Sequence, residues 1–219
     1  MCRINIVLAC ASYLDLRDVL GKRVIEVGSR DVNGSIRPII EAMEPQEYIG
    51  VDIVEGPGVD LLCSAENLAQ EFGEESFDLV VSTEMLEHVR DWKQSINNMK
   101  RICRPNGAIL ITTRSRGYPF HDHPADFWRF ETEDMESIFS DFEIVRLEKD
   151  EIRPGVFMKA IKPEKFVLKD ISDYGVYSIV SNSRTNEEGG GNKKTLHYRI
   201  SVIRFYLRRS LARWARSLL

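Results

Sequence analysis

The sequence predicts an α/β fold in which helices cover both faces of a doubly wound, mostly parallel sheet. Short apolar stretches alternate with longer stretches of helical spacing, which is the pattern of successive βαβ units. The first apolar stretch, RVIEVG at 23–28, is apolar enough for a central strand that is buried on both faces. A chain of 219 residues that is 43% hydrophobic can bury the core of one such domain and still carry an appendage.

We expect seven strands and four helices in the first 162 residues. The strands are 23–28, 47–53, 58–63, 76–82, 108–113, 142–150 and 155–162, and the helices are 35–43, 64–72, 91–104 and 131–141. Ser35, Ser64 and Thr132 are the expected N-caps of three helices, and the RPNG turn at 104–107 precedes the fifth strand. Because no helix separates the last two strands, we expect them to form an antiparallel hairpin that closes the sheet.

The composition divides the chain into three parts. Residues 1–162 form the predicted α/β domain. Residues 163–195, which contain the stretch SNSRTNEEGGGNKK, are rich in Gly, Asn and Ser and predict a flexible linker. Residues 196–219 predict a basic amphipathic helix with six arginines, whose apolar stripe consists of Ile200, Ile203, Leu207, Leu211, Trp214 and Leu218. Such a helix could lie on an anionic membrane, or it could dock on the domain or on a second subunit.

Charge and cysteine usage narrow the classes of partner and compartment. From Gly189 onward the chain has eight basic and no acidic residues, which leaves 22 basic and 34 acidic residues before it, a formal charge of −12. An acidic body argues against a general nucleic-acid-binding surface. The cysteines form no CxxC pair and indicate reduced thiols. The apolar opening INIVLACASYL is too short for a signal peptide or a membrane span. We therefore expect a cytoplasmic protein, with peripheral membrane contact or self-association through 196–219.

The stretch VIEVGSRDVNG, from Val24 to Gly34, predicts a ligand-binding turn between the first strand and its helix. A dinucleotide-binding turn needs glycines where this chain has Arg30 and Asn33, so pyrophosphate and nicotinamide cofactors are disfavoured. Three acids stand near strand ends instead, namely Glu26, Asp52 and Glu66. These acids suit a cofactor that has a ribose, an adenine and an amino-acid cation but no phosphate. S-adenosylmethionine is such a cofactor.

The chain resembles the class I S-adenosylmethionine-dependent methyltransferases over roughly residues 20–161. The resemblance rests on VIEVGSRDVNG, YIGVDI, SAENL, FDLVVSTEMLEHV and RPNGAILITT, which occur in the order of that family. It implies a Rossmann-like seven-stranded fold, S-adenosylmethionine as cofactor and S-adenosylhomocysteine as product. It also implies the cofactor-binding residues: Glu26 and Gly28 near the methionine part, Asp52 at the ribose, Ala65 and Glu66 at the adenine, and Ser82 and Thr83 beside the cofactor. We also expect Ser29, Arg30 and Ile53 to bind the cofactor, and the backbone of Arg30 and Asn33 to border the methionine carboxylate.

Three histidines lie in two segments that follow the fourth and fifth strands and should open onto the same crevice. His88 belongs to STEMLEHVRDW at 82–92, and His121 and His123 belong to GYPFHDHPADFWRF at 117–130. Methyl transfer to a hydroxyl needs an aligned nucleophile and a group that removes its proton. Histidine, with an ordinary pKa of about 6.5, suits that task. All three are therefore candidate catalytic residues.

The DFWRF stretch at 126–130 allows two interpretations. Arg129 could bind an acidic group of the substrate, while Phe127, Trp128 and Phe130 could roof the site and exclude water. Alternatively, this stretch is a packed lid in which Asp126 and Arg129 pair with each other.

The methyl acceptor also allows more than one interpretation. The ExxEH motif Glu84–Glu87–His88, with a later histidine, looks like the metal site of small-RNA 2′-O-methyltransferases, and ubiquinone-pathway O-methyltransferases are similar. The acidic body argues against RNA, and we include no metal among the expected cofactors. SRDVNGS and HPADFWRF look more like methyltransferases of glycan pathways. The expected reaction is therefore O-methylation of a small molecule or of a sugar or lipid-linked glycan. A non-catalytic cofactor-binding module remains an alternative.

Overall fold

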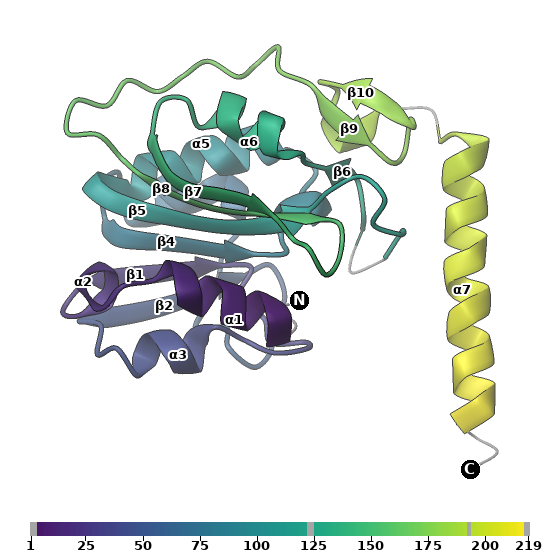
Figure 1. The fold of residues 1–219 in the computed structure, drawn as a ribbon, viewed down its shortest axis with the longest axis horizontal. Helices are drawn as coiled ribbons and strands as arrows, with labels where there is room; N and C mark the ends of the chain where they lie inside the picture. Colours follow the sequence, from purple (N-terminus) through teal and green to yellow (C-terminus); the bar gives the residue numbers. More distant parts are fainter. Residues whose placement is uncertain (1–3, 122–124, 192–193, 217–219) are drawn as a thin grey trace.

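The centre of the protein is a seven-stranded sheet, seen in a computed structural model that describes residues 4–121, 125–191 and 194–216 (Figure 1). In spatial order its strands are β3 (Leu61–Leu62), β2 (Glu47–Asp52), β1 (Arg23–Val27), β4 (Phe77–Thr83), β5 (Cys103–Arg114), β8 (Gly155–Ile161) and β7 (Glu143–Lys149). All neighbouring pairs are parallel except β5–β8 and β7–β8, which are antiparallel. The mostly parallel sheet and its closing hairpin are therefore confirmed.

Helices cover both faces of this sheet, and each face has its own apolar core. The helical elements of the domain are α1 (Ile4–Tyr13), α2 (Leu16–Val19), α3 (Arg37–Glu41), η1 (Ala65–Asn67), α4 (Leu68–Phe72), η2 (Leu86–His88), α5 (Trp92–Ile102) and α6 (Thr132–Ile138). Figure 1 shows α1, α2 and α3 on one face and α5 and α6 on the other. Successive residues of β1 alternate between the two cores: Val24 packs with α1 and α3, and Ile25 packs with α5 and α6.

The apolar opening of the chain is a helix of the domain. Ile6 and Cys10 of α1 are fully buried in the core that contains Val24. At the end of α1, the Tyr13 hydroxyl donates a hydrogen bond of 2.8 Å to Glu148 of β7. Residues 4–13 therefore cover part of the sheet, a role that the apolar composition did not reveal.

The predicted elements are present, but several of their bounds differ. The helix expected at 35–43 is α3, whose N-cap is Ile36 and not Ser35, and the strand expected at 58–63 is shortened to β3. Ser64 caps η1 as expected, because its hydroxyl accepts a hydrogen bond from the Glu66 N–H. The N-cap of α6 is Glu131 and not Thr132, since Glu131 forms a capping box with Asp134. The RPNG turn lies inside β5, which begins at Cys103 and changes its register with β4 there.

A second, three-stranded antiparallel sheet lies beside the first. Its strands are β10 (Ser183–Thr185), β9 (Val176–Ser178) and β6 (Trp128–Arg129). Two of them lie within residues 163–195, which we expected to be a flexible linker. Val176 and Ser178 are fully buried. This part of the expected linker is thus folded against the segment that follows β5.

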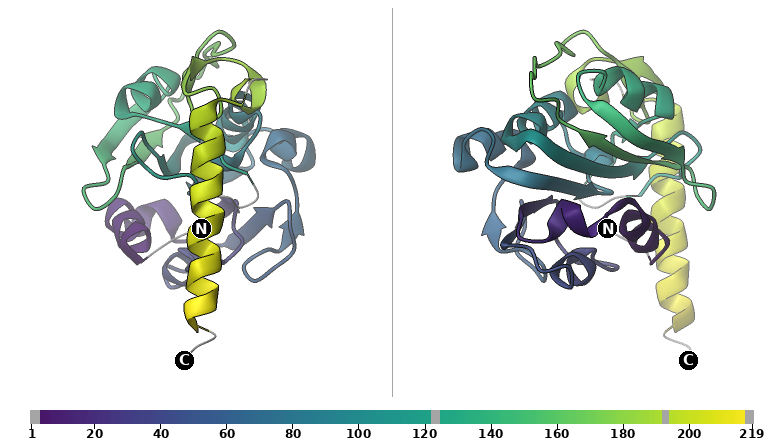
Figure 2. Two further views of the ribbon diagram at one scale, coloured as in Figure 1. Left: turned by 90° about the vertical axis from the view of Figure 1, so that its right-hand side faces the viewer. Right: turned by 60° about the vertical axis from the view of Figure 1, so that its left-hand side comes forward.

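The predicted basic helix is present as α7 (Leu196–Arg216). It stands beside the domain and extends beyond it, as the views in Figures 1 and 2 agree. Among residues 4–121, 125–191 and 194–216, no helix has the length and apolar character needed to cross a membrane.

Candidate functional site

A crevice of about 550 Å³ opens where the sheet strands β1, β2 and β4 end at their carboxyl sides. Ligands of open α/β sheets bind at this edge, where the strand order reverses, because the loops there diverge. The crevice is lined by Val27, Gly28, Arg30, Val32, Asp52, Ile53, Val54, Cys63, Ser64, Ala65, Glu66, Glu84, Met85, His88, Val89, Arg90, Ala125 and Phe127. It therefore brings together six of the ten predicted cofactor residues and one predicted catalytic histidine.

The turn after β1 forms one wall of the crevice, and Gly28 sets its shape. Gly28 has a φ of +82°, and a Cβ atom there would lie 2.6 Å from Cγ of Met85. The N–H groups of Gly28 and Ser29 both donate to the Val51 carbonyl, at 2.8 and 3.0 Å. This turn is held against β2, and its backbone can come close to a ligand only because no side chain intervenes.

Asp52, at the end of β2, lies on the adjacent wall. Its carboxylate accepts hydrogen bonds from the backbone N–H groups of Arg30 at 3.3 Å and Val54 at 3.0 Å. Each carboxylate oxygen has a second acceptor site, so Asp52 can also accept two hydroxyl groups. Ala65 and Glu66 line the crevice from η1, and the Glu66 carbonyl is fixed by Gln94 and Asn98 of α5.

Four predicted cofactor residues are buried beneath the crevice wall. These are Glu26, Ser29, Ser82 and Thr83, each at most 2% exposed. Burial raises the pKa of Glu26 to about 7, although a hydrogen bond from the Tyr48 hydroxyl acts in the opposite direction. Their position indicates that they support the turn.

His88 lies in η2 and also lines the crevice. Its Nδ1 atom is hydrogen-bonded to the Ala125 carbonyl, which can only accept, so Nδ1 carries the proton. The Nε2 atom then has a lone pair, and it is buried without a hydrogen-bond partner among the residues that the structure describes. Burial also lowers the pKa of His88, so the ring is neutral near pH 7.

His121 lies next to His88, with ring centroids 4.7 Å apart. Its Nδ1 atom is 3.0 Å from the Asp126 carboxylate, and its Nε2 atom is 3.7 Å from Oε1 of Glu87. Burial by itself would lower the pKa of His121, but its interactions with the carboxylates of Asp126 and Glu87 outweigh burial and raise the pKa to about 9. The third predicted histidine, His123, lies outside the described residues.

Glu87 joins the two histidines into one cluster. It is fully buried, its Oε2 atom accepts a hydrogen bond of 2.9 Å from Thr113, and its Oε1 atom has no hydrogen-bond partner within the described part of the chain. One ligand atom from each of Glu87, His88 and His121 lies within 4.8 Å of the others. This arrangement could hold a divalent cation, because a second group orients each of the three side chains.

Glu84 of the ExxEH motif is held apart from this cluster. It pairs with Arg114 of β5, and Thr112 donates a hydrogen bond of 3.3 Å to it. Its backbone has a φ of +55°, which is unusual for a residue with a side chain.

Arg129 does not face the crevice, so the expectation that it binds a substrate group is wrong in this structure. It forms a two-point ion pair with Asp126, with N–O distances of 2.5 and 2.7 Å, and is almost fully buried. Trp128 and Phe130 are fully buried in the core against Trp92. Phe127 alone of the three aromatic residues lines the crevice. The packed-lid interpretation therefore describes this stretch.

Sequence reasoning missed several residues that shape the site. Met85 fills the space opposite Gly28, Tyr48 holds Glu26, and Arg114 pairs with Glu84. The position of Met85 inside the ExxEH motif was the available signal for that residue. The contacts of Tyr48 and Arg114 join residues that are far apart in the sequence, and no local pattern encodes them.

Comparison with known proteins agrees with this geometry. A family profile described as a methyltransferase domain matches residues 7–148. The ubiquinone biosynthesis O-methyltransferase of Pseudomonas syringae pv. tomato is 32% identical over 120 residues, which cover 48% of this chain and 50% of that protein. The chain thus spans about half the length of the curated relatives that it matches.

Two solved structures have a similar fold. The Burkholderia thailandensis 1,6-didemethyltoxoflavin-N1-methyltransferase, which contains S-adenosylhomocysteine, has a TM-score of 0.57 at 16% identity and covers 72% of this chain and 78% of that one. The Haemonchus contortus phosphoethanolamine N-methyltransferase 2, which contains S-adenosylmethionine, has a TM-score of 0.57 at 18% identity and covers 73% and 53%. The chain therefore belongs to the methyltransferase domain family of class I S-adenosylmethionine-dependent methyltransferases.

Proposed function

We propose that this methyltransferase transfers the methyl group of S-adenosylmethionine to an oxygen of a small molecule, and that His88 removes the proton of the acceptor hydroxyl. The observation that supports this proposal most strongly is that His88 lines the same crevice as Gly28, Asp52 and Ala65. The similarity to ubiquinone biosynthesis O-methyltransferases supports an oxygen acceptor. A hydroxyl of a sugar or lipid-linked glycan belongs to the same reaction type.

The residues of the crevice fit the cofactor. A volume of about 550 Å³ falls within the range typical of small-molecule sites. We assign Asp52 to the ribose hydroxyls, because its oxygens have acceptor sites free of the backbone contacts described above. The backbone of Gly28, which lines the crevice without a side chain, suits the methionine part, and Ala65 and Glu66 suit the adenine.

The chain's own contribution to the reaction is positioning and proton removal. When bound, S-adenosylmethionine supplies an electrophilic methyl group and leaves as S-adenosylhomocysteine. His88 Nε2 would take the proton of the acceptor hydroxyl, so that the oxygen could accept the methyl group. His88 suits this role better than His121, because its Nε2 atom has the lone pair, whereas His121 is held protonated between two carboxylates.

Replacing His88 tests this assignment. We expect His88→Asn to lower kcat by roughly 10²–10⁴-fold, the usual effect of losing a general base, while the Kd for S-adenosylmethionine changes less than about twofold. The measurement is S-adenosylhomocysteine release with a panel of catechols, phenols and sugars. His197→Asn, on α7, is the matched control and should keep full activity. Undiminished turnover in His88→Asn would remove this residue from the mechanism.

A second candidate, metal-assisted O-methylation, is favoured by the cluster of Glu87, His88 and His121. A cation there would lower the pKa of the acceptor hydroxyl directly, so no base would be needed. Treatment of the wild-type enzyme with a chelator, followed by addition of Mg²⁺ or Mn²⁺, separates the two candidates. Loss of activity and its return with the cation would support the metal, and unchanged activity would support His88 acting as a base.

A further inference from the structure

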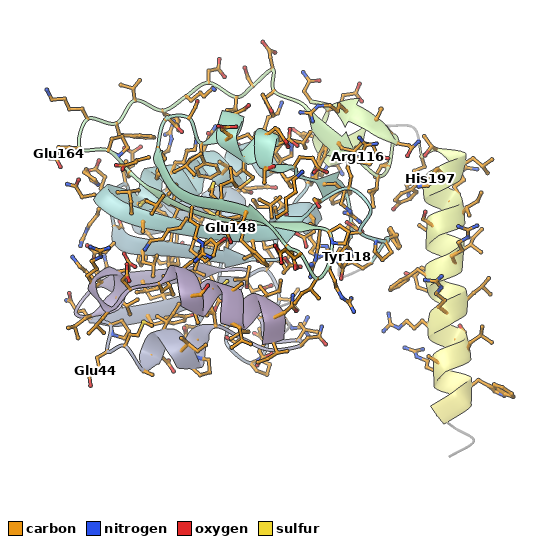
Figure 3. All side chains as sticks on the ribbon, in the orientation of Figure 1. Glu44, Arg116, Tyr118, Glu148, Glu164 and His197 are labelled. Carbon is orange, nitrogen blue, oxygen red and sulfur yellow. The ribbon has the colours of Figure 1, made fainter. Side chains whose placement is uncertain are left out.

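The two faces of α7 differ in what they contact. Tyr198 and Phe205 contact the ring of Phe120 at centroid distances of 5.6 and 5.5 Å, and Val202 between them is half-buried. Residues spaced three or four apart lie on one side of a helix. This side therefore faces the domain, close to the loop that carries Tyr118, which lies at the end of the domain nearest α7 (Figure 3).

The other side of α7 has a continuous apolar face. At 3.6 residues per turn, its members at 196, 200, 203 and 207 lie about 200° from a residue of the docked side two positions away, and those at 211 and 214 continue the same stripe. We define this apolar face as Leu196, Ile200, Ile203, Leu207, Leu211 and Trp214, which are 39 to 74% exposed. Side chains project from α7 both toward the domain and away from it (Figure 3). The docking of α7 thus leaves its most aliphatic side facing outward.

Arginines flank the apolar face on both sides. Arg199 and Arg213 follow one edge, and Arg204 and Arg208 follow the other, by the same helical spacing. Residues 196–216 contain six arginines and no Asp or Glu. An apolar centre with cationic edges is the pattern of helices that lie in the interface of a membrane.

We propose that α7 binds the surface of an anionic lipid membrane through this apolar face. Anionic headgroups would neutralise both rows of arginines while the aliphatic side chains and Trp214 enter the acyl boundary. A second copy of α7 fits this face less well, because two such helices packed face to face would bring arginine rows together without acidic partners. The inference goes beyond methyl transfer and does not depend on it.

Vesicle binding by the full chain is the direct test. We expect the protein to sediment with vesicles of phosphatidylcholine mixed with phosphatidylglycerol, to remain in solution with pure phosphatidylcholine, and to be released by high salt. Trp92 and Trp128 are buried, so a blue shift of tryptophan emission on binding would report Trp214. The shift should be absent in Trp214→Phe.

Paired variants identify the surface. Leu207→Asp should weaken vesicle binding more than about tenfold, because it places a charge in the centre of the apolar face. Val167→Asp changes an exposed valine outside α7 and should bind as the wild type does. Each lost positive charge should weaken vesicle binding about fivefold, so replacing both Arg204 and Arg208 by Gln should weaken it by at least roughly tenfold. Replacing both by Lys keeps the charges and should leave vesicle binding unchanged. Unchanged S-adenosylmethionine affinity in every variant shows that the domain is folded.

Two results would overturn the proposal. One is equal binding, or no binding, of the wild type to anionic and neutral vesicles. The other is a dimer in sedimentation equilibrium without lipid that Leu207→Asp converts to a monomer, because a second copy would then cover the apolar face.

Discussion

Gly28 and Gly73 have almost the same φ, +82° and +78°, but different surroundings. A Cβ atom on Gly28 would lie 2.8 Å from Cβ of Met85, whereas one on Gly73 would meet only Oγ of Ser76 at 3.7 Å. Both positions strain a residue with a side chain. Only at Gly28 would the side chain also displace a residue of the crevice.

This difference predicts the effects of two alanine substitutions. Gly28→Ala should weaken S-adenosylmethionine binding by roughly tenfold or more, because Met85 and the turn must move. Gly73→Ala should cost about 1–2 kcal/mol of unfolding free energy from backbone strain and leave the affinity unchanged. Calorimetric titration and urea unfolding measure the two quantities. Equal affinity in both variants would contradict the role of Gly28.

Glu26 predicts a pH dependence of stability. Its ordinary pKa is 4.5, and burial raises the pKa to about 7 in the folded protein. The stabilisation from its protonated form is fully present below about pH 4.5 and is lost as the pH rises through about 7. The loss amounts to about 3 kcal/mol. Glu26→Gln, which is neutral at every pH, should lack this component.

Urea unfolding of both proteins at about pH 5 and about pH 8 measures this effect. We expect the wild type to lose stability relative to Glu26→Gln between these two values, since only the wild type must bury a charge at the higher pH. Parallel pH profiles would contradict the shifted pKa.

At the scale of elements, the hairpin of β9 and β10 supports the site from a distance. The Ile179 N–H donates to the Phe127 carbonyl, and the Phe127 N–H donates to the Glu87 carbonyl, both at 2.9 Å. The chain of contacts runs from β9 through the crevice wall to the cluster of Glu87, His88 and His121. We therefore expect damage to β9 to affect both stability and activity.

Two identical substitutions in this segment test that role. Val176 is fully buried in β9, and Val167 is 82% exposed in the preceding loop. Val176→Asp should lower the unfolding free energy by about 3 kcal/mol or more, because it buries a charge without a partner, and should reduce turnover. Val167→Asp should stay within about 0.5 kcal/mol of the wild type. Similar stability of the two variants would mean that the segment behaves as the linker that its composition suggests.

The elements also show which parts of the fold the sequence encodes locally. The central strands β1, β4 and β5 contain apolar runs, and Ser64 is a capping residue next to its helix, so the sequence predicts both. The strands β6, β9 and β10 have only two or three residues, too few to show a period. The pairing of β6 with β9 also depends on contacts between positions about fifty residues apart, such as Trp128 with Ser178.

The same distinction holds for the site. Asp52 ends β2, and Ala65, Glu66 and His88 lie a few residues beyond the ends of β3 and β4. Parallel strands bring their carboxyl ends to one edge, so the convergence of these residues was predictable. Which histidine is the better candidate base was not predictable. That depends on the group beside each ring, which is the Ala125 carbonyl for His88 and the Asp126 carboxylate for His121.

At the scale of the whole molecule, charge separates two surfaces with different tasks. The chain before Gly189 carries a formal charge of −12, and the segment from Gly189 onward has eight basic and no acidic residues. This separation accords with both proposals, a cationic cofactor bound among acids in the crevice and an anionic surface bound by the arginines of α7. The contact of Phe120 with α7 places these two surfaces next to each other.

The most direct test of the central claim is a calorimetric titration of S-adenosylhomocysteine into the wild type, Asp52→Asn and Asp173→Asn. We predict that the wild type and Asp173→Asn, an exposed control, bind equally, and that Asp52→Asn binds roughly 10- to 100-fold more weakly, because it loses charge-assisted hydrogen bonds to the ribose. Absence of binding to the wild type, or equal binding by Asp52→Asn, would contradict the assignment of this crevice as the cofactor site.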